Sequence, residues 1–245
     1  MKKVTLFCLA YCFFGCPLVL AEGVSAEIAS DTCHPIPKAG IPQYVIGYGS
    51  LMDEASRQRS ASGAAEAVPV RVQGFRRAWI ARGASIGFST TFLGASIDSK
   101  SVMNAVLFPV VREPDIAIMD ARENGYCRVQ VSKNQIETLD LSAVPDGEIW
   151  LYATQQQNLA SASAAYPIVQ SYVDVFLAGC LQIEARFQLE GFARECVGST
   201  HGWSKHWVND RIYPRRPFIY QPKAGAIDRV LNKEIPAYFR AIRIE

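Results

Sequence analysis

The sequence predicts an α+β fold in which a closed or strongly curved sheet is followed by a mainly helical C-terminal extension. Residues 43–154 contain short runs of alternating bulky and polar residues, separated by glycine turns and short helical stretches. From Pro167 onward the apolar residues recur with helical spacing over about five turns. Of the 245 residues, 49% are hydrophobic and 20% are charged, which excludes a disordered tail and a fibrous protein.

The N-terminus has the layout of a secretory signal peptide. Two lysines precede an apolar run from Val4 to Leu20, and the small residue Ala21 closes it. The sequence therefore predicts removal of residues 1–21 and export to the periplasm or out of the cell. An N-terminal membrane anchor is the alternative, although Pro17 and the shortness of the run are unfavourable for a spanning helix.

Lipid anchoring at Cys16 is a less favoured alternative. Phe13–Cys16 resembles a lipobox, but Phe stands where a branched apolar residue is usual, and Pro17 follows the cysteine. No second apolar run of comparable length follows, so we expect no membrane span after signal removal.

The charge balance gives no argument for an acidic partner. Lys+Arg 25 against Asp+Glu 23 becomes 23 against 23 when the two lysines of the signal are removed. The pairs Arg76-Arg77 and Arg215-Arg216 are too isolated for a basic patch. We therefore expect no binding to nucleic acid.

The first elements follow from local patterns. Residues 22–42 carry Ser, Pro and Gly and are expected to form an N-terminal arm. Residues 43–48 read as a short apolar strand and residues 52–60 as a short polar helix. Residues 68–81 alternate bulky and polar side chains around Gly74, which predicts a bent strand or two strands.

The later elements complete the two regions. Strands are expected at 88–93, 102–110, 125–131 and 148–154, and a helix at 113–121. In the extension, residues 155–245, Pro167 occupies a favoured first-turn position of a helix that continues to residue 187. A further helix at 224–233 ends before Pro236. Because no linker separates the regions, we expect the extension to pack on the sheet region.

Four cysteines remain after signal removal. In an exported protein Cys33, Cys127, Cys180 and Cys196 can form two disulfides, and three pairings are open. Cys127 and Cys180 lie in apolar runs, so buried free thiols are the alternative for these two. There is no CxxC motif, and the histidines lack the spacing of a zinc site, so we expect no metal.

Tyr48-Gly49-Ser50-Leu51 is the first candidate for chemistry. An apolar strand runs into Gly49 and then into an expected helix, which directs backbone N–H groups outward. Such groups bind carboxylate or oxyanion oxygens, and glycine lets a ligand approach the main chain closely. A tight turn without a ligand has the same pattern. The segment lacks the GxSxG pattern of serine hydrolases.

Glu123 is the second candidate. The expected helix ends near Arg122, Gly125 turns the chain and a strand begins at Tyr126, so the turn could aim Glu123 into a cavity. With apolar and aromatic neighbours, this carboxylate would have a raised pKa and could act as a general base near neutral pH. A surface glutamate at a helix end is the alternative.

Together these segments resemble the gamma-glutamylcyclotransferase-like proteins. The matching segments are the glycine loop at Tyr44–Leu51, the next strand at Val72–Trp79, the strand at Ala105–Val110, the glutamate segment at Asp120–Val131 and the closing strand at Glu148–Tyr152. The resemblance covers residues 43–154, under half of the chain.

This resemblance implies a small mixed β-barrel with flanking helices, and an enzyme without a metal or an organic cofactor. The α-amine of a small γ-glutamyl peptide or amine would attack its own γ-carbonyl, giving 5-oxoproline and a free amine. Glu123 would serve as general base and then as general acid. The residues that would bind the substrate are Tyr48, Gly49, Ser50, Leu51 and Tyr126.

Residues 200–216 are dense in aromatic and ionisable side chains. They include His201, Trp203, His206, Trp207, Asp210, Arg211, Arg215 and Arg216. In one interpretation the Trp residues pack on the sheet region and the Arg residues bridge carboxylates and chain ends. In the other, the segment covers the pocket mouth and its arginines bind an anionic part of the substrate. The alternative function is a non-catalytic exported binding protein that uses the pocket and the extension on a protein partner.

Overall fold

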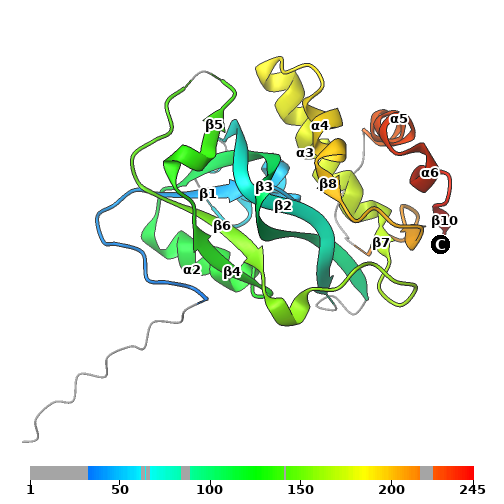
Figure 1. The fold of residues 1–245 in the computed structure, drawn as a ribbon, viewed down its shortest axis with the longest axis horizontal. Helices are drawn as coiled ribbons and strands as arrows, with labels where there is room; N and C mark the ends of the chain where they lie inside the picture. The colour runs from blue at the N-terminus through cyan, green and yellow to red at the C-terminus, as the bar shows by residue number, and fades with distance from the viewer. Residues whose placement is uncertain (1–32, 62–63, 65–66, 84–88, 141, 216–222) are drawn as a thin grey trace, which may run out of the picture.

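A computed structural model describes residues 33–61, 64, 67–83, 89–140, 142–215 and 223–245. The expected signal peptide, Cys16, Arg216 and part of the N-terminal arm lie outside these residues. Within them, no helix is both long enough and apolar enough to cross a membrane. Figure 1 shows a sheet region with the helices of the last third of the chain gathered along one side of it.

Among the described residues, the main sheet has seven strands. They are β1 Gln43–Gly47, β2 Val68–Gly83, β3 Thr90–Val110, β4 Tyr126–Gln130, β5 Ile136–Thr138, β6 Glu148–Thr154 and β8 Thr200–His201. The order is β4-β6-β1-β3-β2-β5, with β8 paired to β2. Pairing is antiparallel except between β1 and β6 and between β2 and β8. The α+β class is confirmed, but closure into a barrel is not, because no pairing joins β4 to β5 in the described part of the chain.

The β2–β3 hairpin corrects one expectation. Separate strands were expected at 88–93 and 102–110, whereas β3 runs without interruption from Thr90 to Val110. Residues 98–101 bulge out of the ladder opposite Gly74, which has a φ of +90°, and the pairing resumes beyond them. The polar residues of the bulge face solvent and interrupt the strand pattern in the sequence. The sequence therefore indicated two strands where the structure has one. The expected bend of β2 at Gly74 is confirmed.

Helices join the strands close to the expected positions. In the sheet region they are η1 Ser50–Met52, α1 Glu54–Gln58, α2 Glu113–Arg122, η3 Lys133–Gln135 and η4 Gln156–Asn158. In the extension they are α3 Gln170–Phe187, α4 Phe192–Gly198, α5 Ala224–Glu234 and α6 Pro236–Phe239. Pro236 begins α6, as proline at a first helical position does, in addition to following α5.

The start of α3 differs from the expectation, since Pro167 does not lie in its first turn. Between Pro167 and the helix, β7 Ile168–Val169 pairs with β9 Trp207–Asn209, which also pairs with β10 Arg243–Ile244. A second, three-stranded sheet thus lies within the extension. Strands this short carry no pattern of their own and form because a distant backbone partner is available.

One hydrophobic core joins the two regions. Side chains from the sheet, such as Val45, Trp79 and Phe108, belong to the same buried cluster as Phe176 of α3 and Trp207 of β9. Neighbouring residues of each strand point to the opposite face of the sheet, which carries a separate apolar cluster. The extension therefore covers one face of the main sheet as part of the same folded unit.

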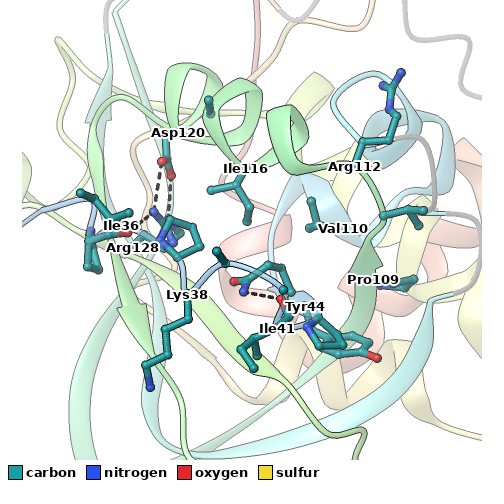
Figure 2. A pocket seen from close by; sticks show the side chains of 18 of the residues that line it. Ile36, Lys38, Ile41, Tyr44, Pro109, Val110, Arg112, Ile116, Asp120 and Arg128 are labelled. Carbon is teal, nitrogen blue, oxygen red and sulfur yellow. Dashed lines mark hydrogen bonds and ion pairs between the residues drawn. The ribbon is translucent and has the colours of Figure 1, made fainter.

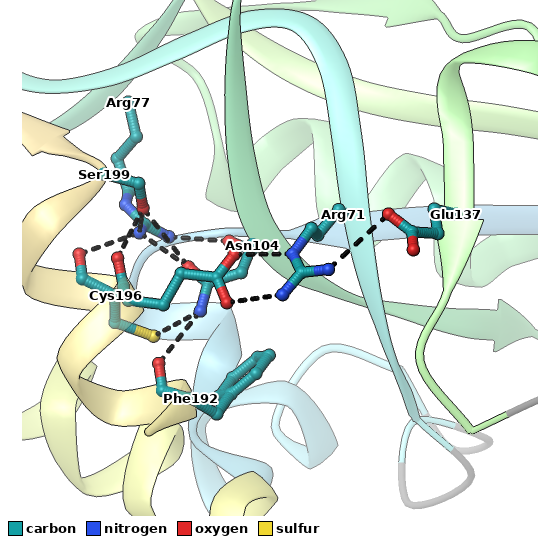
Figure 3. Close-up of polar contacts among 8 residues, drawn as sticks. Arg71, Arg77, Asn104, Glu137, Phe192, Cys196 and Ser199 are labelled. Carbon is teal, nitrogen blue, oxygen red and sulfur yellow. Dashed lines mark hydrogen bonds and ion pairs between the residues drawn. The ribbon is translucent and has the colours of Figure 1, made fainter. Parts of the chain in front are cut away.

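Polar contacts reinforce this attachment, as Figure 3 shows. The buried Arg77 of β2 donates to Cys196 O and Ser199 Oγ, both at 2.8 Å. Asn104 of β3 donates to Phe192 O at 3.0 Å. Arg71 forms two bonds to Glu195, at 2.8 and 3.0 Å.

Two disulfides select one of the three open pairings. Cys33–Cys127 ties the N-terminal arm to β4, and Cys180–Cys196 ties α3 to α4. Cys127 and Cys180 are therefore bonded cysteines and not buried free thiols. Because Cys196 also supplies a carbonyl to Arg77, the second disulfide lies next to the contact between the sheet and the extension.

The dense segment after residue 200 has a structural role. Trp203 stacks on Trp207 with ring centroids 5.1 Å apart and packs against Trp79 at 5.2 Å. Arg211 bonds to Asp174 and Asp228 at 2.8–2.9 Å, and Arg215 pairs with Glu245. Asp210 is buried and accepts from the backbone and hydroxyl of Ser171. The tryptophans pack and the arginines bridge carboxylates, as the first interpretation expects.

Candidate active site

The turn after β1 depends on two glycines. A Cβ atom at Gly47 would lie 2.7 Å from the Cβ of Leu51, and one at Gly49 would lie 2.9 Å from Tyr172 Oη. Real Cβ atoms essentially never come this close, so the turn excludes side chains at both positions. η1 begins at Ser50, and the first amides of a helix have no intrahelical acceptor. The turn therefore has helix-start amides without an intrahelical acceptor, next to a glycine that Tyr172 approaches closely.

Glu123 is placed by the end of α2. Its N–H donates to Met119 O at 2.9 Å as the helix closes, and its carbonyl accepts from Tyr126 N at 2.9 Å as β4 begins. Ile116 and Met119 bury the inner face of α2 and fix the helix on the sheet. The Glu123 side chain is 16% exposed, so it is not the surface glutamate of the alternative interpretation.

Glu123 and the Gly49 turn line the same small recess, of about 30 Å³. The residues around this recess are Ile46, Tyr48, Gly49, Ser50, Leu51, Leu93, Glu123, Tyr126, Tyr152 and Tyr172. Glu123 and the five residues predicted to bind the glutamyl substrate (Tyr48, Gly49, Ser50, Leu51 and Tyr126) are all among them. The structure thus brings together two segments that lie more than seventy residues apart in the chain.

A wider cavity of about 340 Å³ adjoins the recess. The two share Ser50, Glu123, Tyr126 and Tyr172. The other walls of the wider cavity are Ala81, Arg82, Gly83, Phe92, Arg122, Asn124, Gly125 and Asn158. A ligand held in the recess would therefore extend past Glu123 into a polar space.

Arg122 contacts both Glu123 and Ser50 of the Gly49 turn. Its Nε lies 3.0 Å from Glu123 Oε1, and its Nη2 donates to Ser50 Oγ at 3.2 Å. It also bonds to Ser56 and Ser60 in and after α1. The apolar and aromatic neighbours predicted for Glu123 line the recess, but the sequence does not predict the cation beside it. The guanidinium therefore adds a positive charge beside the Glu123 carboxylate.

Three tyrosines of the recess donate hydrogen bonds to other groups of the protein. Tyr48 Oη donates to Tyr152 O at 2.6 Å, Tyr152 Oη to Asp120 Oδ1 at 2.6 Å, and Tyr126 Oη to Leu93 O at 3.0 Å. Burial, followed by the charge of Glu123, raises the pKa of Tyr48 well above its usual value. Burial and the bond to Asp120 raise the pKa of Tyr152. These phenols therefore stay protonated and form rigid walls.

The residues of the two cavities that were not nominated from the sequence include Arg82, Arg122 and Tyr172. Arg82 and Arg122 looked like ordinary charged residues, and Tyr172 falls on the apolar face of α3, where a core role is the simplest expectation. Arg211 and Arg215, which were candidates for binding an anion, do not line either cavity. The local sequence does not distinguish residues that line a cavity from residues that do not, because the difference depends on which elements pack together.

A larger cavity, of about 640 Å³, lies between the N-terminal arm and α2 (Figure 2). It contains none of the nominated site residues. The carboxylate at its base, Asp120, accepts from Arg128 Nε at 2.9 Å and from Tyr152 at 2.6 Å. Because the residues predicted for the reaction line the recess and not this cavity, the site by Glu123 is the better candidate for the proposed chemistry.

Neither the known family models nor the curated proteins include a match to this chain. Solved structures do match. A gamma-glutamyl cyclotransferase is 12% identical over 60% of this chain and 87% of its own, with a TM-score of 0.43. A yeast gamma-glutamyl cyclotransferase specific to glutathione is 10% identical over 79% and 97%, with a TM-score of 0.41. An Arabidopsis thaliana protein is 20% identical over 49% and 73%, with a TM-score of 0.37.

The structures similar to this chain thus include gamma-glutamyl cyclotransferases, the family that its motifs resemble. The likeness is one of fold.

Proposed function

We propose that this protein is a γ-glutamyl cyclotransferase that releases 5-oxoproline from a small γ-glutamyl compound. The observation that carries the proposal is the position of Glu123 in one recess with the Gly49 turn. A partly buried carboxylate beside a main-chain binding turn suits an intramolecular aminolysis, which needs a group that moves protons and a surface that holds the glutamyl chain. The motif resemblance of residues 43–154 supports the same reaction.

In this proposal Glu123 moves protons between two nitrogens. The substrate ammonium first loses a proton to water, and its nitrogen then attacks the γ-carbonyl carbon, whose π electrons move to oxygen. Glu123 accepts the second proton of the attacking nitrogen and returns it to the leaving nitrogen as the old C–N bond breaks. The carbonyl re-forms, 5-oxoproline and a neutral amine result, and the amine takes up a proton from water.

The turn and Arg122 prepare the site for this step. Main-chain amides at Gly49–Leu51 would bind the glutamyl group, and Arg122 holds both Glu123 and Ser50 in place before the substrate arrives. Because the nucleophile belongs to the substrate, the protein mainly folds the glutamyl chain back on itself. No cofactor enters the proposed mechanism.

The alternative of a partner-binding extension gains no support. Residues 170–187 and 207–209 belong to the core shared with the sheet, and Arg211 and Arg215 are bound to carboxylates. We therefore propose that the extension serves the fold and the site. Export remains our proposal from the N-terminal sequence.

The test is 5-oxoproline release by the purified protein, with and without residues 1–21. The substrates are γ-glutamyl amino acids, γ-glutamyl amines and glutathione. We expect release from at least one of them, and its loss in Glu123→Gln. No release from any member of the panel would contradict the proposed function.

The leaving amine is expected to carry a carboxylate group. Arg82 lines the wider cavity and lies over the ring of Tyr166, 4.2 Å from its centroid. The carboxylate of Glu123 is already paired with Arg122, whereas none of the described carboxylates pairs with Arg82. A guanidinium so placed suits the carboxylate of a departing amino acid or peptide.

Arg82→Gln should therefore reduce kcat/KM for γ-glutamylalanine about 10-fold, the scale of one charge-assisted hydrogen bond. It should leave γ-glutamylethylamide, which lacks the carboxylate, nearly unchanged. Arg76→Gln, at an exposed arginine of the same strand, is the matched control. Equal losses on both substrates would contradict the assignment.

A further inference from the structure

The described part of the N-terminal arm is attached to the start of β4. Cys33 forms a disulfide with Cys127, the second residue of that strand. The backbone N–H of Arg128 donates to Cys33 O at 2.8 Å, and His34 Nε2 lies 3.1 Å from Tyr126 O. Since Tyr126 lines the recess, the disulfide fixes the arm directly behind a wall of the candidate active site.

The arm also supports the loop that carries Glu123. Arg128 Nη2 donates to Pro35 O of the arm at 2.6 Å. The same guanidinium bonds to Asp120 through Nε at 2.9 Å and through Nη2 at 3.3 Å, as Figure 2 shows. Asp120 lies in the last turn of α2 and Arg128 lies in β4, so their ion pair closes the loop between the helix and the strand. Glu123 is part of this closed loop.

The arm packs loosely on the rest of the protein. The cavity of about 640 Å³ lies beneath it and is lined by residues 34–42 of the arm. None of these residues is buried, and Ile36 is 65% exposed, so the arm gains little from apolar burial. The N–H of Lys38 donates to Glu148 Oε2 at 2.8 Å, which fixes the middle of the arm separately. We therefore expect the residues before Lys38 to leave β4 when Cys33 is released.

The two disulfides differ in their access to solvent. Cys33 and Cys127 are half-buried. Cys180 and Cys196 are fully buried, in the core that the sheet shares with the extension. A disulfide is broken by a thiolate that must reach one of its sulfurs. Of these two bonds, the one that holds the arm should therefore exchange first in the folded protein.

We propose that the disulfide-bound arm positions Glu123 for proton transfer, and that the Cys33–Cys127 bond is a redox switch for the site. The inference rests on the proposed cyclotransferase function. In the oxidised protein the arm holds Arg128 and, through it, Asp120 and the Glu123 loop. In the reduced protein the arm leaves β4 and the Asp120–Arg128 pair meets water, where an ion pair contributes little. Glu123 then loses its fixed position.

The switch passes two electrons to a small organic disulfide, for which 2-hydroxyethyl disulfide is the probe. The thiolate of one cysteine attacks this disulfide, which gives a mixed disulfide and releases one 2-hydroxyethanethiolate. The thiolate of the other cysteine attacks the protein sulfur of the mixed disulfide, and the second 2-hydroxyethanethiolate leaves. The two protons of the protein thiols pass through water to the released thiolates. Dithiothreitol reverses the reaction and is oxidised to its cyclic disulfide.

The first test measures access to the disulfides and does not use activity. The folded protein is treated with dithiothreitol, its thiols are alkylated with iodoacetamide, and the labelled peptides are identified by mass spectrometry. We expect labelling of Cys33 and Cys127, while Cys180 and Cys196 stay bonded. Labelling of all four at the same rate, or of none, would overturn the inference.

The second test is the turnover of γ-glutamylalanine by the oxidised and the reduced protein, well below Tm. We expect kcat to fall about 10-fold on reduction, because displacement of a proton-transferring group is costly, while KM stays within about twofold. Reoxidation with 2-hydroxyethyl disulfide should restore kcat. A disulfide that only stabilises the fold would lower Tm on reduction and leave kcat unchanged, and that result would overturn the inference but not the proposed function.

The double variant Cys33→Ser/Cys127→Ser is the control for the reagents. Because serine cannot form the bond, its kcat should equal that of the reduced wild type and should not respond to dithiothreitol. A response as large as that of the wild type would assign the effect to another bond and overturn the inference. An oxidised wild-type protein that releases no 5-oxoproline would instead refute the proposed function, and the switch with it.

Discussion

Glu123→Gln is expected to lower 5-oxoproline release at least ~100-fold, the usual scale for the loss of a general base. Glutamine keeps the shape of the side chain but cannot accept the proton of the attacking nitrogen. The ion pair with Arg122 is lost, but both side chains are partly exposed, so the free energy of unfolding should fall by no more than about 1 kcal/mol. Turnover and Tm measured together separate the chemical role from the structural one.

The matched control is Glu190→Gln, at an exposed glutamate of the extension. It should retain wild-type turnover. Substrate affinity of Glu123→Gln, measured from the rise in Tm with γ-glutamylalanine, should also persist, because the binding turn is intact. Turnover within a few-fold of the wild type in Glu123→Gln would remove Glu123 from the mechanism.

Arg77→Met is expected to have the largest effect on stability. Arg77 is fully buried and makes six hydrogen bonds, which join Tyr48 and Asn104 to the extension. Burial lowers the pKa of Arg77 to about 9, so the side chain still carries its charge at neutral pH. Methionine fills the volume but leaves buried carbonyls and hydroxyls without a donor, at a cost of about 3 kcal/mol or more.

Chemical denaturation, followed by tryptophan fluorescence, measures this loss. Arg76→Met, at the exposed neighbour of Arg77 on β2, should change stability little. Arg77 also donates to Tyr48 O at 3.2 Å, so the variant should loosen the turn and reduce turnover as well. A denaturation midpoint equal to that of the wild type would contradict the assignment of Arg77 as the main polar link.

These expectations share one structural cause, which is the merging of the extension with the sheet region. α3 supplies Tyr172 to the recess, and α4 supplies acceptors to Arg77 behind the same turn. The Cys180–Cys196 disulfide joins these two helices. The site is therefore bounded by both parts of the chain, although only residues 43–154 carry the family-like motifs.

The local sequence was sufficient for the elements that carry strong patterns. β1 and β6 are apolar runs, α2 has helical spacing, and the Gly49 turn follows from a strand that meets a helix start. Glu123 could be nominated because a helix end, Gly125 and a new strand confine it to a tight turn. Each of these depends on interactions between residues close together in the chain.

The other features of the fold and the site depend on contacts between residues that are distant in the sequence or on how the elements pack. The pairing of β7 with β9 arises from backbone groups that are far apart in sequence, and so does the choice of disulfide partners. The ion pair of Arg122 with Glu123 depends on rotamers that the packed turn selects. Tyr172 is indistinguishable from a core residue until α3 is laid along the Gly49 turn. Sequence patterns report which face of an element is apolar, but only packing determines what that face meets.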